Sequence, residues 1–374
     1  MSTSYKVTVC PDISVVSNVF RCGGLDLLMR GMHDQTFKNF EVILVDNRYE
    51  KRHKKVMEWA KHYGLERFYH VPEYRRNGKW SVMAAGWDTG FMLAEAPVVI
   101  MLIDYAYAPA GWIERHLEHH YDRKSRLKKV FVMSPHCHVQ MPPIWLKKPI
   151  ADFQAWVEKQ QRKRECCLIQ ENWEEYFDEM SIFGSIFEPE WLESLRIDQL
   201  PHQDPKLYLS SYTTLWSAER GGQIAKMPPV DYKWMHMKNE SFSLDTVLDV
   251  GGIDETFDND KGPMDTEFGF RLQKSGCEVV FDRLNPVFIP NPRWIMGSMP
   301  WGDKDVRLEG RWSFNNDGIP YQDKRIKEMS EGAPTVAQNS YSLREKRKEL
   351  LHWKKLDVVP TGNLDMGGKY AFLA

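Results

Sequence analysis

Apolar residues follow two alternating patterns along the first third of the chain. Short runs rich in β-branched and other apolar residues are typical of buried strands, whereas apolar residues three or four positions apart are typical of amphipathic helices. The runs predict strands over 13–16, 41–45, 68–71 and 97–103, and the spaced segments predict helices over 25–32, 54–63 and 81–94. Strands and helices that alternate with short connections favour an α/β fold with a parallel, doubly wound sheet.

The remaining residues follow a less regular pattern. Residues 140–235 contain Pro-rich and mixed-charge segments, and we interpret them as an elaboration of the main domain. After residue 290 the pattern breaks into segments rich in Pro, Gly and Trp, and a charged helix is expected near residues 342–355. We therefore expect one main domain over residues 1–290 and an irregular C-terminal extension over residues 291–374.

Composition and charge limit the classes of protein that this chain fits. Its 374 residues are enough for one large α/β domain or for a core domain with an appendage. A net charge of -2 provides no overall attraction to nucleic acid or to anionic lipid. No apolar run approaches the roughly 20 residues of a membrane span, and the six Cys include no C-x-x-C pair. We expect a cytoplasmic protein with reduced thiols and no membrane span.

Carboxylates follow two of the predicted strands. Asp46 closes the strand over 41–45, and Asp104 closes the strand over 97–103. In open α/β sheets, ligands bind in the crevice at the carboxyl ends of the strands. Both carboxylates are therefore candidate ligand-binding groups.

A third carboxylate, Asp265, begins an amphipathic helix that follows the glycine-bearing turn at 251–252. A carboxylate in such a position is suited to take a proton from a hydroxyl group. Glu267 lies two residues further on and points roughly 200° away around the helix, so it cannot share this task. We expect Glu267 to pair instead with Arg271 at i+4.

Together these segments resemble the inverting family 2 glycosyltransferases of the GT-A fold over residues 10–290. The resemblance rests on the sequences ISVVSN at 13–18, DQTFKNFEVILVD at 34–46, ID at 103–104, GWI at 111–113, GGIDE at 251–255 and DTE at 265–267. Members of this family transfer a sugar from a nucleotide-sugar donor to an acceptor hydroxyl with inversion of configuration. The resemblance therefore implies a Rossmann-like GT-A domain with a mixed, mainly parallel sheet flanked by helices. It also implies hexosyltransferase-type activity, a UDP-linked donor and an acceptor-side region over residues 140–235.

The resemblance also implies roles for individual residues. Asp265 would be the general base that deprotonates the acceptor hydroxyl, and Asp46 would accept a hydrogen bond from the imide N–H of a uracil ring. The donor-binding residues implied in this way are Ser17, Asn18, Asp46, Arg75, Lys79 and Asp104, and the acceptor-binding residues are Asp254, Glu255 and Trp112.

A divalent cation, Mn²⁺ or Mg²⁺, is the cofactor that the resemblance implies. Asp104 occupies the first position of the family's Asp-x-Asp motif, whose carboxylates hold the cation against the diphosphate. Ala106 stands in place of the second carboxylate. Three arrangements stay open: Asp104 holds the cation with help from elsewhere, basic residues such as Arg75 and Lys79 offset the phosphate charge, or the site is degenerate.

The acceptor is expected to be a glycan or a small molecule, and two alternatives stand beside this reading. Basic clusters at 51–55, 123–129, 162–164 and 344–348 would form a phosphate track if they lie on the side of Asp265. The acceptor would then be a hydroxylated base in DNA. The incomplete Asp-x-Asp motif instead favours a non-catalytic module that binds nucleotide sugars or glycans.

Histidines gather in two further segments. His116 and His120 lie at i and i+4, but Leu117 replaces the Glu of a zinc-hydrolase helix, so a solvated helix face is expected. His136 and His138 would share one face of a strand, a geometry that also suits a metal ligand pair.

Overall fold

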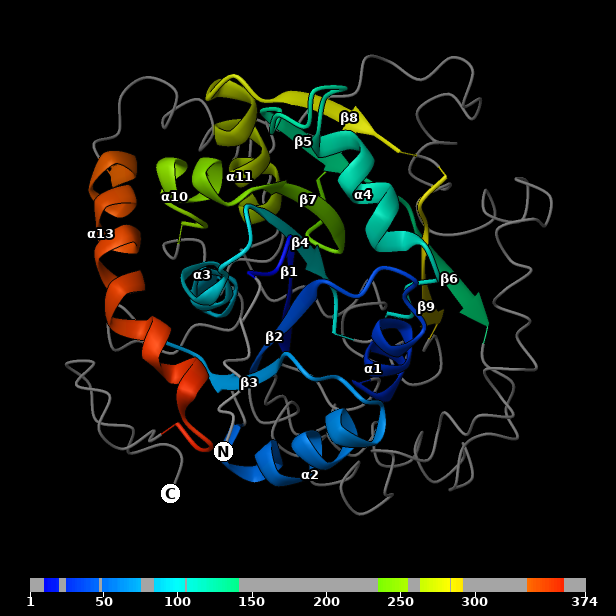
Figure 1. Ribbon diagram of the computed structural model, residues 1–374. Helices are drawn as coiled ribbons and strands as arrows, with labels where there is room; N and C mark the ends of the chain where they lie inside the picture. Colours follow the sequence, from blue (N-terminus) through cyan, green and yellow to red (C-terminus); the bar gives the residue numbers. More distant parts are fainter. Residues whose placement is uncertain are drawn as a thin grey trace, which may run out of the picture.

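The computed structural model describes residues 10–19, 25–46, 49–74, 84–104, 106–140, 235–254, 263–282, 284–291 and 335–359. These residues form an α/β fold in which helices flank a mixed, mainly parallel seven-stranded sheet, as the sequence predicts (Figure 1). The strand order is β3-β2-β1-β4-β7-β5-β8, and β7 runs antiparallel to both of its neighbours. The strands are β1 (Ile13–Val19), β2 (Phe40–Asp46), β3 (Phe68–Pro72), β4 (Val98–Leu102), β5 (Val130–Met133), β7 (Asn239–Ser243) and β8 (Glu278–Phe281).

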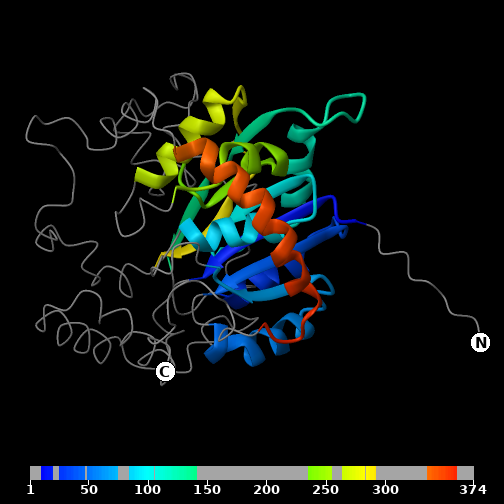
Figure 2. The same cartoon turned by 90° about the vertical axis from the view of Figure 1, so that its left-hand side faces the viewer.

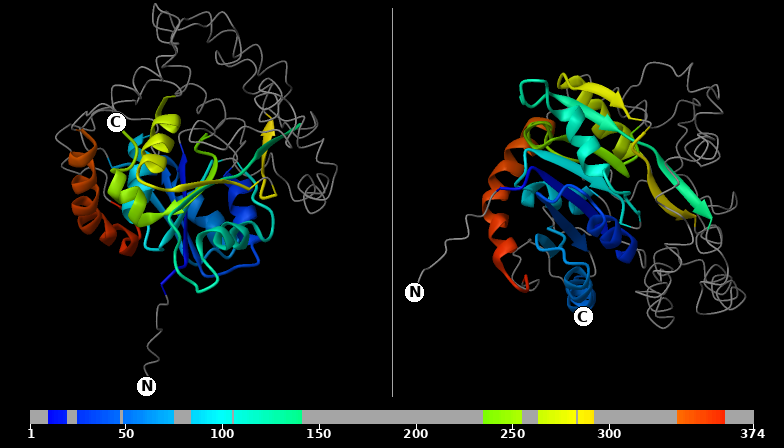
Figure 3. Two further views of the ribbon diagram at one scale, coloured as in Figure 1. Left: turned by 90° about the horizontal axis from the view of Figure 1, so that it is seen from above. Right: turned by 45° about the vertical axis from the view of Figure 1, so that its right-hand side comes forward.

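A second, smaller sheet pairs β6 (His136–Gln140) with β9 (Val287–Asn291) in parallel. These two strands follow β5 and β8 closely in the chain and extend away from the main sheet (Figure 3). A backbone bridge between Tyr107 and Phe288 ties β9 to the segment after β4. The small sheet therefore lies beside the carboxyl end of β4.

Two helical layers cover the two faces of the main sheet. One layer contains α1 (Leu25–His33), α2 (Tyr49–His62) and α4 (Trp112–His120). The other contains α3 (Ala84–Leu93), α10 (Leu244–Val250), α11 (Pro263–Lys274) and α13 (Thr335–Leu350), which leads into the 3-10 helix η6 (Leu351–Lys355). None of the helices in the described ranges has both the length and the apolar composition of a membrane-crossing segment.

The burial of the inner strands explains why the secondary structure of the first third of the chain is predictable from its sequence. Every residue of β1, β2 and β4 is buried. Helices cover both faces of the sheet, and strands in such a sheet are therefore mainly apolar. The central strand β7 is different. Its sequence NESFS is mostly polar, although all five residues are buried.

The charged helix that the sequence predicts near the C-terminus is confirmed, and it begins at Thr335. It lies against α3 and α10 (Figure 2), and Leu343, Leu350 and Trp353 belong to the same hydrophobic core as α3. Lys354 of η6 forms a buried ion pair with Glu41 at the start of β2. This part of the expected extension is therefore built into the main sheet's packing.

Candidate functional site

Two carboxylates lie at the carboxyl edge of the sheet, as the sequence predicts. Asp46 ends β2 and Asp104 follows β4, and these strands flank β1 on its two sides. Both residues are fully buried. The edge that they share is where ligands bind in sheets of this type.

The carboxylate of Asp46 is held by two cationic or potentially cationic side chains. His70 Nε2 lies 3.2 Å from its Oδ2 atom, and Arg52 donates to its Oδ1 atom at 3.5 Å. The His70 ring stacks on His53, with ring centroids 5.3 Å apart. Asp46 is thereby fixed in one orientation, which a base-reading carboxylate requires; its role in reading uracil stays a prediction.

The two predicted donor-binding residues on β1 point to opposite faces of the sheet, because side chains alternate along a strand. Asn18 packs against α3, where a Cβ added at Gly86 would lie 2.3 Å from its Oδ1 atom. Ser17 faces the layer that contains α1 and is fully buried. Three other predicted residues, Arg75, Lys79 and Glu255, lie outside the described residues.

The residues around Asp104 do not fit the carboxylate pair of a divalent-cation site. Ala106, which stands at the second motif position, is fully buried and offers no oxygen ligand from its side chain. Within the described ranges, no group of three or more His, Cys, Asp or Glu side chains is arranged to hold a metal ion. Hard cations such as Mg²⁺ require several oxygen ligands, and the described residues supply Asp104 alone from this motif.

Asp265 lies in the first turn of α11, as predicted, and is half-buried. Its Oδ1 atom accepts a hydrogen bond from the Thr266 backbone N–H at 3.0 Å. Burial raises the pKa of Asp265 to about 6, and this effect outweighs the hydrogen bond and the nearby Lys238 charge, which both lower it. The carboxylate is therefore a stronger base than an exposed Asp and is ionised at neutral pH.

The predicted pairing of Glu267 with Arg271 is confirmed. Arg271 donates from Nη2 to Glu267 Oε2 at 2.7 Å, and both side chains are buried. The same guanidinium also donates to the backbone carbonyls of Val250 and Gly252, at 2.6 and 2.7 Å. Arg271 thereby fixes the position of α11, and so of Asp265, relative to the glycine turn.

The glycine turn itself packs too closely for any side chain at its second position. Gly252 has φ of +68°, and an added Cβ would lie 2.2 Å from Asp88 Oδ1. The same Asp88 atom accepts a hydrogen bond from the Ile253 backbone N–H at 2.7 Å. The turn places Asp254, a predicted acceptor-binding residue, in a buried position directly after it.

Lys238 is a residue at this edge that the sequence analysis missed. Its backbone carbonyl accepts a hydrogen bond from the Ile103 N–H at 3.1 Å, so it lies beside Asp104. Its ammonium group donates to His136 Nε2 at 3.1 Å. Its charge also lowers the pKa of Asp265. Lys238 therefore lies between the end of β4 and the small sheet, near enough to Asp265 for its charge to act on that carboxylate.

A tight turn before β7 holds Lys238 in place. The Glu240 carboxylate accepts backbone hydrogen bonds from His236, Lys238 and Asn239, at 3.1, 2.5 and 2.8 Å. Burial raises the pKa of Glu240 to about 7, and these hydrogen bonds partly oppose the shift. Met237 has φ of +52°, in the left-handed region that residues other than Gly rarely adopt.

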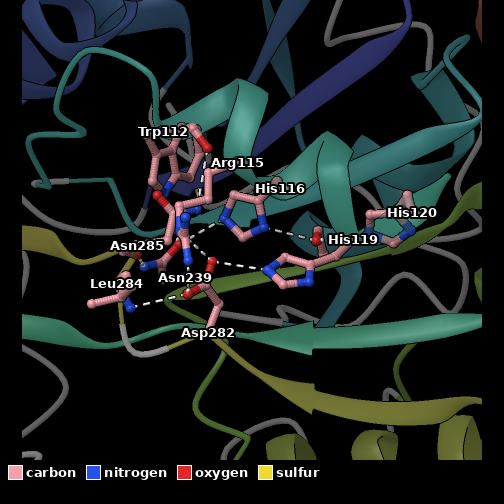
Figure 4. A network of polar contacts seen from close by, with 10 residues as sticks. Trp112, Arg115, His116, His119, His120, Asn239, Asp282, Leu284 and Asn285 are labelled. Atoms are coloured by element: carbon pink, nitrogen blue, oxygen red, sulfur yellow. Dashed lines mark hydrogen bonds and ion pairs between the residues drawn. The ribbon is translucent and has the colours of Figure 1, made fainter. Parts of the chain in front are cut away.

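A buried polar network joins α4 to β7 (Figure 4). Trp112 Nε1 donates to Asn239 Oδ1 at 2.9 Å, and His116 Nε2 lies 3.1 Å from the same oxygen. The Ser241 hydroxyl lies 2.8 Å from both His116 Nδ1 and His120 Nε2. Trp112 is thus a buried core residue, and its role in acceptor binding stays a prediction.

The expectation of a solvated histidine face on α4 is wrong. His116 and His120 are fully buried, and burial lowers their pKa to about 4 and about 3. Their partner Ser241 lies more than a hundred residues later in the chain, so helical periodicity alone could not reveal it. In the second histidine segment, His136 is buried and its Nε2 atom accepts from Lys238, while the His138 side chain lies outside the described part of the structure.

The buried His120 predicts a loss of stability in acid. The unfolded chain protonates this imidazole near pH 6.5, whereas the folded protein does so only near pH 3. The unfolded state therefore binds more protons between these values, and the free energy of unfolding falls as the pH drops. In His120→Gln, the amide N–H can replace the donor to Ser241 without titrating. We expect this variant to gain about 2 kcal/mol relative to wild type between pH of about 7.5 and about 5.

Urea unfolding at the two pH values checks this expectation. The raised pKa of Glu240 acts in the opposite direction, because its stabilising protonated form is lost as the pH rises toward 7. Glu240 is present in both proteins, so their difference isolates His120. An unchanged difference between variant and wild type across this range would show that His120 titrates normally in the folded protein.

Two of the basic clusters do not support a phosphate track next to Asp265. Residues 123–129 precede β5 and therefore lie at the amino edge of the sheet, opposite the carboxylates. In the cluster at 344–348, Arg344 forms ion pairs with Asp245 and Asp249. The cluster at 51–55 lies on α2, and the cluster at 162–164 is outside the described residues.

Comparison with protein-family models finds no match for this chain, and comparison with curated proteins finds none either. Among solved structures, the chain is similar to the mannosyltransferase PcManGT from Pyrobaculum calidifontis in complex with GDP-Man and Mn²⁺, with 13% identity, a TM-score of 0.40, and coverage of 94% of this chain and 74% of that one. It is also similar to S. aureus TarS 1-349 in complex with UDP-GlcNAc, with 9% identity, a TM-score of 0.42, and coverage of 91% and 72%.

Proposed function

We propose that this chain is a glycosyltransferase that transfers a sugar from a nucleotide-sugar donor, expected to be UDP-linked, to an acceptor hydroxyl with inversion. The observation that carries the proposal is the half-buried Asp265 in the first turn of α11, a helix that Arg271 ties to the glycine turn. Burial raises the pKa of this carboxyl to about 6. The sequence resemblance supports the same reaction. A base with a pKa near the working pH is the most effective in general base catalysis.

In the proposed reaction, the donor lies along the carboxyl edge, with its base toward Asp46 and its diphosphate toward Asp104. Asp265 accepts the proton of the acceptor hydroxyl while that oxygen attacks the anomeric carbon. The bond between this carbon and the phosphate oxygen breaks, and its electron pair leaves with the nucleoside diphosphate. A single displacement of this kind inverts the configuration of the anomeric carbon. A divalent cation, where one is bound, would stabilise the charge on the departing diphosphate.

Incubation with a panel of UDP- and GDP-linked sugars, with and without Mn²⁺, tests the proposal. We expect wild type to release a nucleoside diphosphate from at least one donor, and we expect Asp265→Ala to bind the same donor without releasing it. The incomplete Asp-x-Asp motif favours one rival, a non-catalytic module that binds nucleotide sugars. Donor binding by wild type without release of diphosphate from any donor would support this rival and contradict the transferase.

A further inference from the structure

We propose that Lys238 binds the diphosphate of the nucleotide sugar and supplies, at the end of β4, the positive charge that a metal-binding carboxylate pair would otherwise recruit. This inference rests on the function proposed above and assigns a phosphate-binding residue to the same site. Asp104 stands without a second motif carboxylate, because Ala106 is a buried apolar residue. The departing diphosphate still requires a cationic partner, whichever group provides it.

The position of Lys238 is fixed by the sheet. Strand β7 pairs antiparallel with β4, with Asn239 opposite Leu102, and the Lys238 carbonyl accepts from the Ile103 N–H at 3.1 Å. Lys238 therefore stands directly beside the last residues of β4, at the edge where the donor's phosphates are expected.

The backbone before Lys238 is strained. Met237 is buried and has φ of +52°, a conformation that costs a residue with a side chain of the order of 1 kcal/mol or more. The Glu240 carboxylate, which accepts three backbone hydrogen bonds in this turn, compensates for the strain. Strained residues of this kind concentrate at functional sites, and the residue that this turn presents is Lys238.

The Lys238 ammonium group lies against His136 of β6. An ammonium can only donate hydrogen bonds, so His136 Nε2 accepts from it at 3.1 Å. Among the described residues, Asp265, Glu240 and His236 lie close enough to Lys238 for its charge to lower their pKa values.

A cation at this position would act on the leaving group. When the bond from the anomeric carbon to the phosphate oxygen breaks, negative charge accumulates on the diphosphate. An ammonium donating to that oxygen stabilises the charge without a metal ion.

Isothermal titration calorimetry in EDTA tests the inference with UDP, GDP, uridine and guanosine as probes. We expect wild type to bind one diphosphate, and Lys238→Met to bind it about ten- to a hundredfold more weakly, because one hydrogen bond from a charged donor is lost. The affinity for the matching nucleoside should not change, since the nucleoside lacks phosphates. Lys238→Arg should lose less than Lys238→Met. Lys124→Met, at an exposed lysine of the opposite edge, serves as the control.

Three results would overturn the inference. The first is a wild-type protein that binds no diphosphate in EDTA, including one that binds it only with Mn²⁺. The second is Lys238→Met with diphosphate affinity within about twofold of wild type. The third is an equal loss of diphosphate and nucleoside affinity, which would indicate a structural role for Lys238. Diphosphate binding that depends on Lys238 without any sugar release would support this inference and contradict the transferase activity.

Discussion

Replacement of Asp265 with Asn should lower sugar transfer about 10²- to 10⁴-fold while donor affinity stays close to that of wild type. Asn has nearly the same shape as Asp but cannot accept a proton, and removal of a general base has an effect of this size. Steady-state rates of nucleoside diphosphate release give the loss of turnover, and calorimetric titration gives the donor affinity. Glu278→Gln, which alters an exposed carboxylate on β8, should leave both quantities unchanged.

The pH dependence of wild type gives a second readout of the same group. Asp265 must be deprotonated to act as a base, and its pKa is raised to about 6. We therefore expect kcat/KM to fall about tenfold per pH unit below this value, an acid limb that the residual activity of Asp265→Asn should lack. Equal turnover by Asp265→Asn and wild type would assign the proton transfer to another residue.

Replacement of Arg271 with Met should lower the free energy of unfolding by about 3–5 kcal/mol. Arg271 is the partner of Glu267, which is fully buried, and removal of one member of a buried pair leaves an uncompensated charge. The variant also deprives the carbonyls of Val250 and Gly252 of their donor. Chemical denaturation followed by circular dichroism measures the loss.

Two matched variants separate the causes of this effect. Lys274→Met, at an exposed position of the same helix, should change stability by no more than about 0.5 kcal/mol. The double variant Glu267→Met, Arg271→Met should recover part of the loss, because no charge is then left unpaired, but not the share that comes from the two carbonyls. A loss below about 1 kcal/mol in Arg271→Met would show that the pair does not hold α11 in place.

The sequence was informative where burial is continuous. Strands β1, β2 and β4 are covered by helices on both faces, so their apolar runs identify them as buried strands in the sequence. The carboxylates that close two of these runs, Asp46 and Asp104, could therefore be assigned to the carboxyl edge of the sheet. The relation between Glu267 and Arg271 was equally predictable, because it depends only on helical spacing. These features follow from local geometry.

The features that were missed depend on pairing between distant segments. Strand β7 has a polar sequence because its side chains bond to α4 and to its own turn, and no periodicity marks it as a central strand. The position of Lys238 follows only from the antiparallel pairing of β7 with β4. The sequence wrongly predicted a solvated face for His116 and His120 because their partner, Ser241, also lies on β7, far from them in the chain.

The configuration of the first sugar released from an α-linked nucleotide sugar, followed by proton NMR before mutarotation, tests the proposed single displacement most directly. Water can serve as the acceptor, so the natural acceptor need not be known. We predict that wild type releases the β-anomer first and that Asp265→Asn releases almost none. Initial release of the α-anomer, or release by Asp265→Asn at the wild-type rate, would contradict a direct attack assisted by Asp265.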